Sequence, residues 1–284
     1  MTATGWVLAG LAVLGAFAVG SFTCVVIDRL PMPLEEPNEF GEDWDTRPWR
    51  DVVGGVSRCT TCGERVRPRD EVPVLSWLVL RGRCRHCGAA IAGFHPWVEL
   101  AVPVLSVLMV LALGWTWLLL PVLFLVPVGI AVAVIDLRTL MVPTRLVWPA
   151  LLVTVALSVV AAWAVDQPTR LVTACACAAT LAAPLALLWW FIPRGMGFGD
   201  VRLSVLLGWT VGLVAGTRPV LGVVQAFVCL ALAAVAGLVL GLVVLGARGR
   251  SAQVPFGPTL VLAAFVCIGL SQQILEPLGG TPLR

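Results

Sequence analysis

The sequence has little charge. Only 12% of its 284 residues are charged, whereas a soluble globular domain carries roughly a quarter, and 59% of the residues are hydrophobic. Apolar runs of about 20 residues, long enough to cross a bilayer as a helix, recur along most of the chain. This composition excludes an ordinary soluble domain and predicts an all-α, polytopic membrane protein.

Lysine is absent, and no solenoid repeat or low-complexity tail is present. A cleaved signal peptide is not expected either. The first apolar run, residues 6–27, is too long and too weakly basic at its start, so it is predicted to be a retained first helix.

The apolar runs predict eight transmembrane helices, at about residues 6–28, 96–114, 115–135, 145–165, 170–192, 201–217, 219–246 and 254–275. Three domains follow from this pattern. They are a first transmembrane helix (1–28), a small extramembrane loop domain (29–95) and a multi-helix membrane domain (96–284).

The arginines predict the orientation of the chain. With eight helices, sixteen arginines fall on one side of the membrane and three (Arg170, Arg218, Arg284) on the other. The positive-inside rule places the side with sixteen in the cytoplasm, and the long first loop lies on that side. Of the 16 acids, 11 lie between Asp28 and Glu71, so the few acids near membrane depth need a specific reason.

The first loop contains two C-x-x-C pairs, Cys59–Cys62 and Cys84–Cys87, separated by 21 residues. Four thiolates at this spacing are typical of a tetrahedral zinc site, and a site filled by sulfur leaves no position for water. The predicted metal is therefore structural zinc, with His86 as a bystander. Two disulfides or four free thiols are the alternatives, and a cytoplasmic loop disfavours disulfides.

The acidic segment 35–51 is interpreted as a solvated, flexible excursion, with a partner-binding segment as the alternative. The other five cysteines are interpreted as small core residues of apolar helices: Cys24, Cys175, Cys177, Cys229 and Cys267.

Two aspartates stand at helix ends on the predicted cytoplasmic side. Asp136 ends the third helix in AVIDLRTLMVP, and Asp200 opens the sixth in GMGFGDVRL. If their helices pack together, the carboxylates can share a proton, activate water and protonate a leaving group, which is aspartic-protease chemistry. Alternatively, Asp200 is only an N-cap and Asp136 pairs with a nearby arginine, Arg138 or Arg145.

Three glycines precede Asp200 at alternate positions: Gly195, Gly197 and Gly199. They are predicted to take positive φ and to let the backbone approach an extended substrate. Glu99, at the start of the second helix, is predicted to face the same cavity, to cap its helix or to pair with an arginine.

These motifs resemble the type IV prepilin peptidases, intramembrane aspartic proteases also called prepilin leader peptidases with N-methyltransferase activity. The similar stretches are GSFTCVVIDRLP, the tetracysteine region through VPVLSWLVLRGRCRHC to WVEL, the two aspartate motifs and PFGP. Two residues depart from the family pattern: Thr144 stands where aspartate or asparagine is frequent, and Arg202 where lysine is usual.

The resemblance implies a multi-pass protein of the bacterial inner membrane that contacts membrane lipid and no nucleic acid. It would cleave the leader of prepilins and pseudopilins at the cytoplasmic face and methylate the new N-terminus with S-adenosylmethionine. Asp136 and Asp200 would be the catalytic pair, and the four cysteines the zinc ligands. No glycine-rich nucleotide loop follows a strand, so the residues do not locate the S-adenosylmethionine site. A proton-coupled transporter and a non-catalytic pilus assembly protein are the alternatives.

Overall fold

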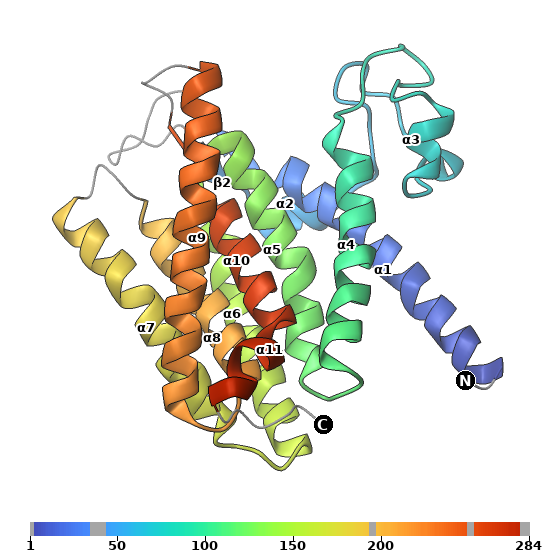
Figure 1. The fold of residues 1–284 in the computed structure, drawn as a ribbon. Helices are drawn as coiled ribbons and strands as arrows, with labels where there is room; N and C mark the ends of the chain where they lie inside the picture. Colours follow the sequence, from blue (N-terminus) through green and yellow to red (C-terminus); the bar gives the residue numbers. More distant parts are fainter. Residues whose placement is uncertain (1–2, 35–43, 193–196, 249–252, 279–284) are drawn as a thin grey trace. The chain divides into compact units, whose positions relative to one another are not determined.

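The computed structural model describes residues 3–34, 44–192, 197–248 and 253–278, and most of these residues are helical (Figure 1). The chain divides into two compact units. Unit 1 comprises Met1–Met32 and Arg47–Val107, and unit 2 comprises Pro33–Thr46 and Leu108–Arg284. The division falls inside one long helix, α4 (Phe94–Leu113).

Unit 1 contains two long apolar helices and the cysteine-rich segment between them. Its elements are α1 (Ala3–Arg29), α2 (Trp49–Val53), the 3-10 helix η1 (Pro68–Asp70), α3 (Leu75–Val79) and most of α4 (Phe94–Leu113). The short strand β1 (Pro31–Pro33) ends at the boundary of the two units, and β2 (Trp44–Thr46) belongs to unit 2. They flank residues 35–43, which include part of the predicted acidic excursion and lie outside the described residues. A Cβ at Gly20 would lie 3.0 Å from the backbone oxygen of Glu99, so α1 and α4 approach closely because glycine stands there.

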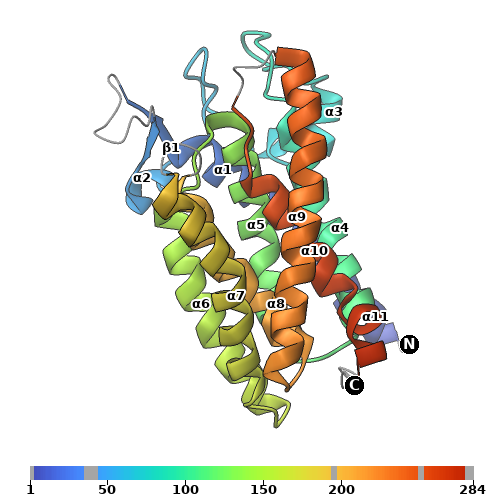
Figure 2. The same ribbon diagram turned by 60° about the vertical axis from the view of Figure 1, so that its left-hand side comes forward.

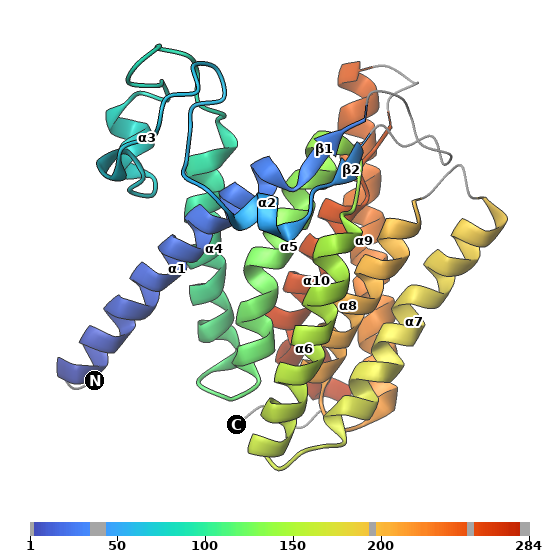
Figure 3. The ribbon, with the colours of Figure 1, turned by 180° about the vertical axis from the view of Figure 1, so that it is seen from behind.

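Unit 2 is a bundle of apolar helices, which Figure 2 and Figure 3 show from two further directions. In chain order they are α5 (Leu119–Thr139), α6 (Thr144–Ala164), α7 (Arg170–Phe191), α8 (Phe198–Ala215), α9 (Pro219–Arg248), α10 (Gly257–Gly269), α11 (Ser271–Leu275) and the 3-10 helix η2 (Glu276–Leu278).

Helix α8 is the centre of unit 2. It packs against α5, α6, α7, α9 and α10, and 67% of its span is buried, compared with 11% for α9. Its closest neighbour is α7, because glycines let the backbones meet: a Cβ at Gly212 would lie 2.5 Å from the Cβ of Cys177. Close approach at small residues is typical of helix pairs in membranes.

A buried arginine binds a backbone oxygen at the C-terminal end of α8. Arg170 is 1% exposed, and its guanidinium donates to the backbone oxygen of Leu213 across 3.1 Å and to the side chain of Gln167 across 2.7 Å. Leu213 lies in the last turn of α8, where backbone oxygens receive no hydrogen bond from an N–H of the same helix. The Arg170 side chain therefore takes the place of water at that helix end.

The prediction of a polytopic all-α membrane protein is confirmed. Among the described residues, seven helices are long and apolar enough to cross a membrane. An eighth span exists only if α10 is joined to α11 and η2, and this pair is bent by 73°. The prediction of one continuous helix at 254–275 was wrong, as α10 ends at Gly269.

Candidate active site and metal centre

The four predicted zinc ligands lie together in unit 1. The Sγ atoms of Cys59, Cys62, Cys84 and Cys87 are all within 4.8 Å of one another, and all four thiols are free. A tetrahedral zinc with Zn–S bonds of about 2.3 Å separates its sulfurs by about 3.8 Å. The Sγ atoms of Cys59 and Cys87 are 3.8 Å apart, so the cluster fits a metal ion of this size. His86 is exposed and does not belong to the cluster.

The two cysteine pairs have the same local fold. The N–H of Cys59 bonds to the oxygen of Glu64 (2.9 Å), and the N–H of Cys84 bonds to the oxygen of Ala89 (2.8 Å). Each pair is followed by a glycine with positive φ, Gly63 at 69° and Gly88 at 71°. The repeated pattern C-x-x-C-G is the signal in the sequence that identifies these glycines.

The backbone of the first pair favours a thiolate. The N–H groups of Cys62 and Thr61 lower the pKa of the Cys59 thiol to about 6. Thiolate is the form of cysteine that binds metal, so these N–H groups favour metal binding at Cys59.

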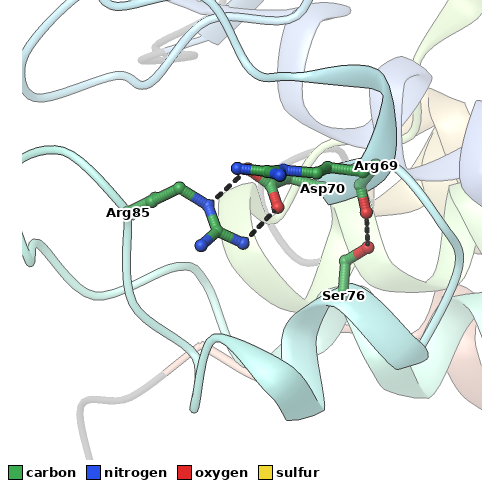
Figure 4. A network of polar contacts seen from close by, with 4 residues as sticks. All are labelled: Arg69, Asp70, Ser76 and Arg85. Carbon is green, nitrogen blue, oxygen red and sulfur yellow. Dashed lines mark hydrogen bonds and ion pairs between the residues drawn. The ribbon is translucent and has the colours of Figure 1, made fainter.

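The segment between the two pairs is tied by polar contacts (Figure 4). The guanidinium of Arg85 donates to both carboxylate oxygens of Asp70, across 2.9 and 2.7 Å, and the hydroxyl of Ser76 donates to the backbone oxygen of Arg69. Arg85 holds the pKa of the Asp70 carboxyl below its usual value. A shallow pocket of about 260 Å³ beside this network is lined by Val72, Leu75 and Val79 as well as by the charged residues.

The carboxylate of Glu99 contacts a backbone N–H of unit 1. Its carboxylate is 8% exposed and accepts a hydrogen bond from the N–H of Val74 across 2.6 Å. His95, which precedes Glu99 on α4, lies 2.8 Å from the carboxylate of Asp28.

Asp136 lies in the last turn of α5, in unit 2. The helix continues past it to Thr139, so the prediction that Asp136 ends the helix was wrong by one turn. Its side chain is 4% exposed, and its Oδ2 accepts a hydrogen bond from the N–H of Gly257 across 2.9 Å. Gly257 is the first residue of α10 and comes from the PFGP segment.

Asp200 lies in the first turn of α8, but it does not cap that helix. The N-cap residue is Gly197, and no side chain donates or accepts there, so the N-cap alternative was wrong. Oδ1 of Asp200 is buried and has no hydrogen-bond partner among the described residues. Asp136 and Asp200 are close enough to interact electrostatically, so the structure brings the two predicted carboxylates together.

Of the glycines before Asp200, Gly199 matters because it lacks a side chain at a close contact, and not because of positive φ. Neither Gly197 nor Gly199 has positive φ, so that prediction was wrong for both, and Gly195 lies outside the described residues. A Cβ at Gly199 would lie 2.7 Å from the Cβ of Val142, whereas a Cβ at Gly197 would meet nothing closer than 3.9 Å among the described residues. Gly199 therefore lets the start of α8 approach the turn between α5 and α6, which contains Val142.

The two residues that depart from the family pattern contact each other. The guanidinium of Arg202 donates to the hydroxyl of Thr144, and it also lies over the ring of Phe198, 4.6 Å from the centroid. Arg202 on α8 and Thr144 at the start of α6 thus form a polar link two residues from Asp200. Their contact joins positions 58 residues apart, so no local pattern in the sequence predicts it.

Comparisons with known proteins show the family to which the chain belongs. The family model for the bacterial peptidase A24 N-terminal domain matches residues 13–113. The prepilin leader peptidase/N-methyltransferase of Aeromonas hydrophila is 32% identical over 276 residues, which cover 93% of this chain and 91% of the relative. The chain belongs to this family.

Other family members are similarly close over nearly their whole length. The prepilin leader peptidase/N-methyltransferase of Pseudomonas putida is 32% identical over 91% of this chain and 89% of its own. That of Burkholderia pseudomallei strain 1026b is 32% identical over 98% of this chain and 90% of its own. No solved structure matches the chain significantly.

Proposed function

We propose that this protein is an aspartic endopeptidase that removes the leader of type IV prepilins and pseudopilins. The observation that carries the proposal is the meeting of Asp136 on α5 with Asp200 on α8 in one apolar bundle. The relatives that match over most of the chain are named prepilin leader peptidase/N-methyltransferase, which supports the same substrate class.

The proposed chemistry needs only the two carboxylates and a water molecule. Two carboxylates in close contact share one proton, because both cannot ionise easily side by side. The ionised carboxyl takes a proton from the water that attacks the scissile carbonyl, and the protonated carboxyl gives its proton to the leaving amine. Oδ1 of Asp200 suits this role, because a buried acceptor with no partner among the described residues is available for water or substrate.

The surrounding residues hold the pair in place. Gly199 allows close contact between α8 and the turn after α5, and the Arg202–Thr144 contact links α8 to α6 beside that turn. The substrate's apolar helix would enter from the bilayer and present its leader at the end of the bundle where both aspartates lie. The apolar, weakly buried outer faces of the other helices suit contact with membrane lipid.

We place the aspartates and the long first loop on the cytoplasmic side of the bacterial inner membrane, on the basis of the arginine distribution. The four cysteines would hold structural zinc, which cross-links the two cysteine pairs and leaves the chemistry to unit 2. Methylation of the new N-terminus with S-adenosylmethionine follows from the relatives' name. A proton-coupled transporter is not favoured.

Incubation of the purified protein with a prepilin, with and without S-adenosylmethionine, tests the proposal. Mass spectrometry of the product should give a shortened chain in both reactions, and a chain heavier by one methyl group only when the methyl donor is present. A shortened chain that is never methylated would support the peptidase activity and refute the methyltransferase activity. An unchanged prepilin in both reactions would refute the proposed function.

A further inference from the structure

The first residue of α10 lies against the carboxylate of Asp136. The N–H of Gly257 donates to Oδ2 across 2.9 Å, in a buried hydrogen bond that joins residues 121 positions apart. A Cβ at position 257 would lie 2.8 Å from the same oxygen and 3.3 Å from the carboxyl carbon. The carboxylate thus occupies the space that any other side chain would need.

The packing of α10 makes this contact a fixed one. Helix α10 packs against both aspartate-bearing helices, α5 and α8. The first N–H groups of a helix have no acceptor within the helix, and they carry the positive end of its dipole. The N–H groups of Thr259 and Leu260 turn back to the oxygen of Phe256, whereas that of Gly257 reaches Asp136.

The two carboxylates differ in their hydrogen bonding. Oδ2 of Asp136 is held by a protein donor, and Oδ1 of Asp200 has no partner among the described residues. The Asp136 carboxyl group is therefore anchored by one oxygen and cannot rotate freely. Its other oxygen keeps a constant direction relative to Asp200, which a water shared by the two acids requires.

We propose that Gly257 is a positioning residue of the peptidase: its N–H holds Asp136 in the reactive orientation, and glycine is needed because the carboxylate fills the place of a Cβ. This inference rests on the proposed function. It extends that function to a third helix, α10, which contributes a backbone group rather than a side chain.

A pair of alanine variants on the same helix tests the steric part. Gly257→Ala should lower kcat for prepilin cleavage about 100-fold, since an error of about 1 Å in a reacting group costs this much, while KM stays unchanged. Gly269→Ala is the matched control, because its Cβ would meet only the flexible end of Met109, at 3.3 Å. It should keep the wild-type kcat and KM. A rise in KM without a fall in kcat for Gly257→Ala would overturn the inference.

An amide-to-ester substitution at Gly257 tests the hydrogen bond without adding an atom to the side chain. Cell-free synthesis of the full chain with glycolic acid at this position replaces the N–H with an ester oxygen, which cannot donate a hydrogen bond. The loss of a hydrogen bond to a charged group should lower kcat roughly 10- to 100-fold, again with KM unchanged. This variant decides the question even if Gly257→Ala fails to fold. An ester variant with the wild-type kcat would overturn the inference.

Asp136→Asn and wild-type protein in the same assay separate this inference from the proposed function. Cleavage by wild type, none by Asp136→Asn and full cleavage by the Gly257 variants would refute the positioning role alone. Cleavage by Asp136→Asn at the wild-type rate would refute the catalytic pair itself, and the positioning role with it.

Discussion

The carboxylate of Glu99 accepts a hydrogen bond from the backbone N–H of Val74 across 2.6 Å, and Val74 has φ 60° and ψ −50°. A β-branched residue rarely adopts positive φ, and such a conformation persists only where the surroundings impose it. Glu99 lies on α4 and Val74 is the residue that precedes α3, so this contact connects a long apolar helix to the segment between the two cysteine pairs. Charge-assisted bonds to a backbone N–H are among the stronger hydrogen bonds in proteins.

Replacing Glu99 with alanine should release the turn at Val74. Loss of a hydrogen bond to a buried charged group costs about 1–3 kcal/mol, which corresponds to roughly 5- to 150-fold faster local opening. Hydrogen exchange of the full-length protein should show this acceleration at residues 72–80. Glu64→Ala is the control, because Glu64 is exposed and its contribution to the first cysteine pair is a backbone oxygen. Equal exchange rates in both variants would contradict the role given to Glu99.

The two glycines of the described G-F-G-D segment should tolerate alanine very differently. Gly199→Ala places a Cβ 2.7 Å from the Cβ of Val142, and overpacking of this kind costs about 1–3 kcal/mol. Thermal unfolding should therefore occur at a lower temperature, and prepilin cleavage should slow. Gly197→Ala should behave as wild type, since its Cβ meets only ordinary contacts.

A second substitution identifies the cause of the Gly199→Ala defect. Val142→Gly removes the opposing Cβ and should restore part of the cleavage rate when combined with Gly199→Ala. Equal defects in Gly197→Ala and Gly199→Ala would indicate that backbone freedom, rather than the contact with Val142, explains the motif.

Removing one cysteine of the cluster should remove the metal. Cys59→Ser leaves three sulfur ligands, so we expect zinc bound at about one ion per chain in the wild type and almost none in the variant. Elemental analysis of the purified protein measures this. Cys175→Ser should keep the full zinc content. Cys175 is exposed on α7, so its interpretation as a core residue was wrong. Because the proposed peptidase groups all lie in unit 2, residual cleavage by Cys59→Ser is expected. A variant that retains its zinc would refute the four-cysteine site.

The ion pair of Asp70 and Arg85 predicts a dependence on pH. Arg85 lowers the pKa of Asp70 in the folded protein, so the pair stabilises the segment above the unfolded pKa of Asp70 and loses this effect as pH falls through the lowered value. Hydrogen exchange of residues 67–85, corrected for the intrinsic pH dependence, should accelerate in wild type on acidification below about pH 4. Asp70→Asn should already exchange fast at pH 7 and lack this acid step. An acid step of equal size in Asp70→Asn would assign it to another group.

The sequence predicts the membrane-spanning helices well, because crossing a bilayer requires runs of about 20 apolar residues and such runs are rare elsewhere. It does not predict the bend after Gly269, since no proline or charged residue lies between Thr259 and Leu275 and the short polar run 271–273 alone does not end a helix. The cysteine cluster was predictable because all four ligands come from one local segment with a fixed spacing.

The candidate active site was predictable only in part. The aspartates stand out because acids are costly in apolar helices. Their partners do not stand out, because the Gly257 contact joins distant positions through a backbone N–H and leaves no trace in side-chain chemistry. The reason for Gly199 was likewise hidden, since a close approach of Val142 depends on how α5 and α8 pack rather than on the local sequence.

The most direct test of the account is prepilin cleavage by Asp136→Asn and Asp200→Asn, each compared with wild type in the same lipid or detergent. Asparagine keeps the size of the side chain and removes the ability to exchange a proton, so the account predicts loss of cleavage in each single variant, by at least about 1,000-fold, with unchanged zinc content and membrane insertion. Cleavage at the wild-type rate by either variant would contradict the account.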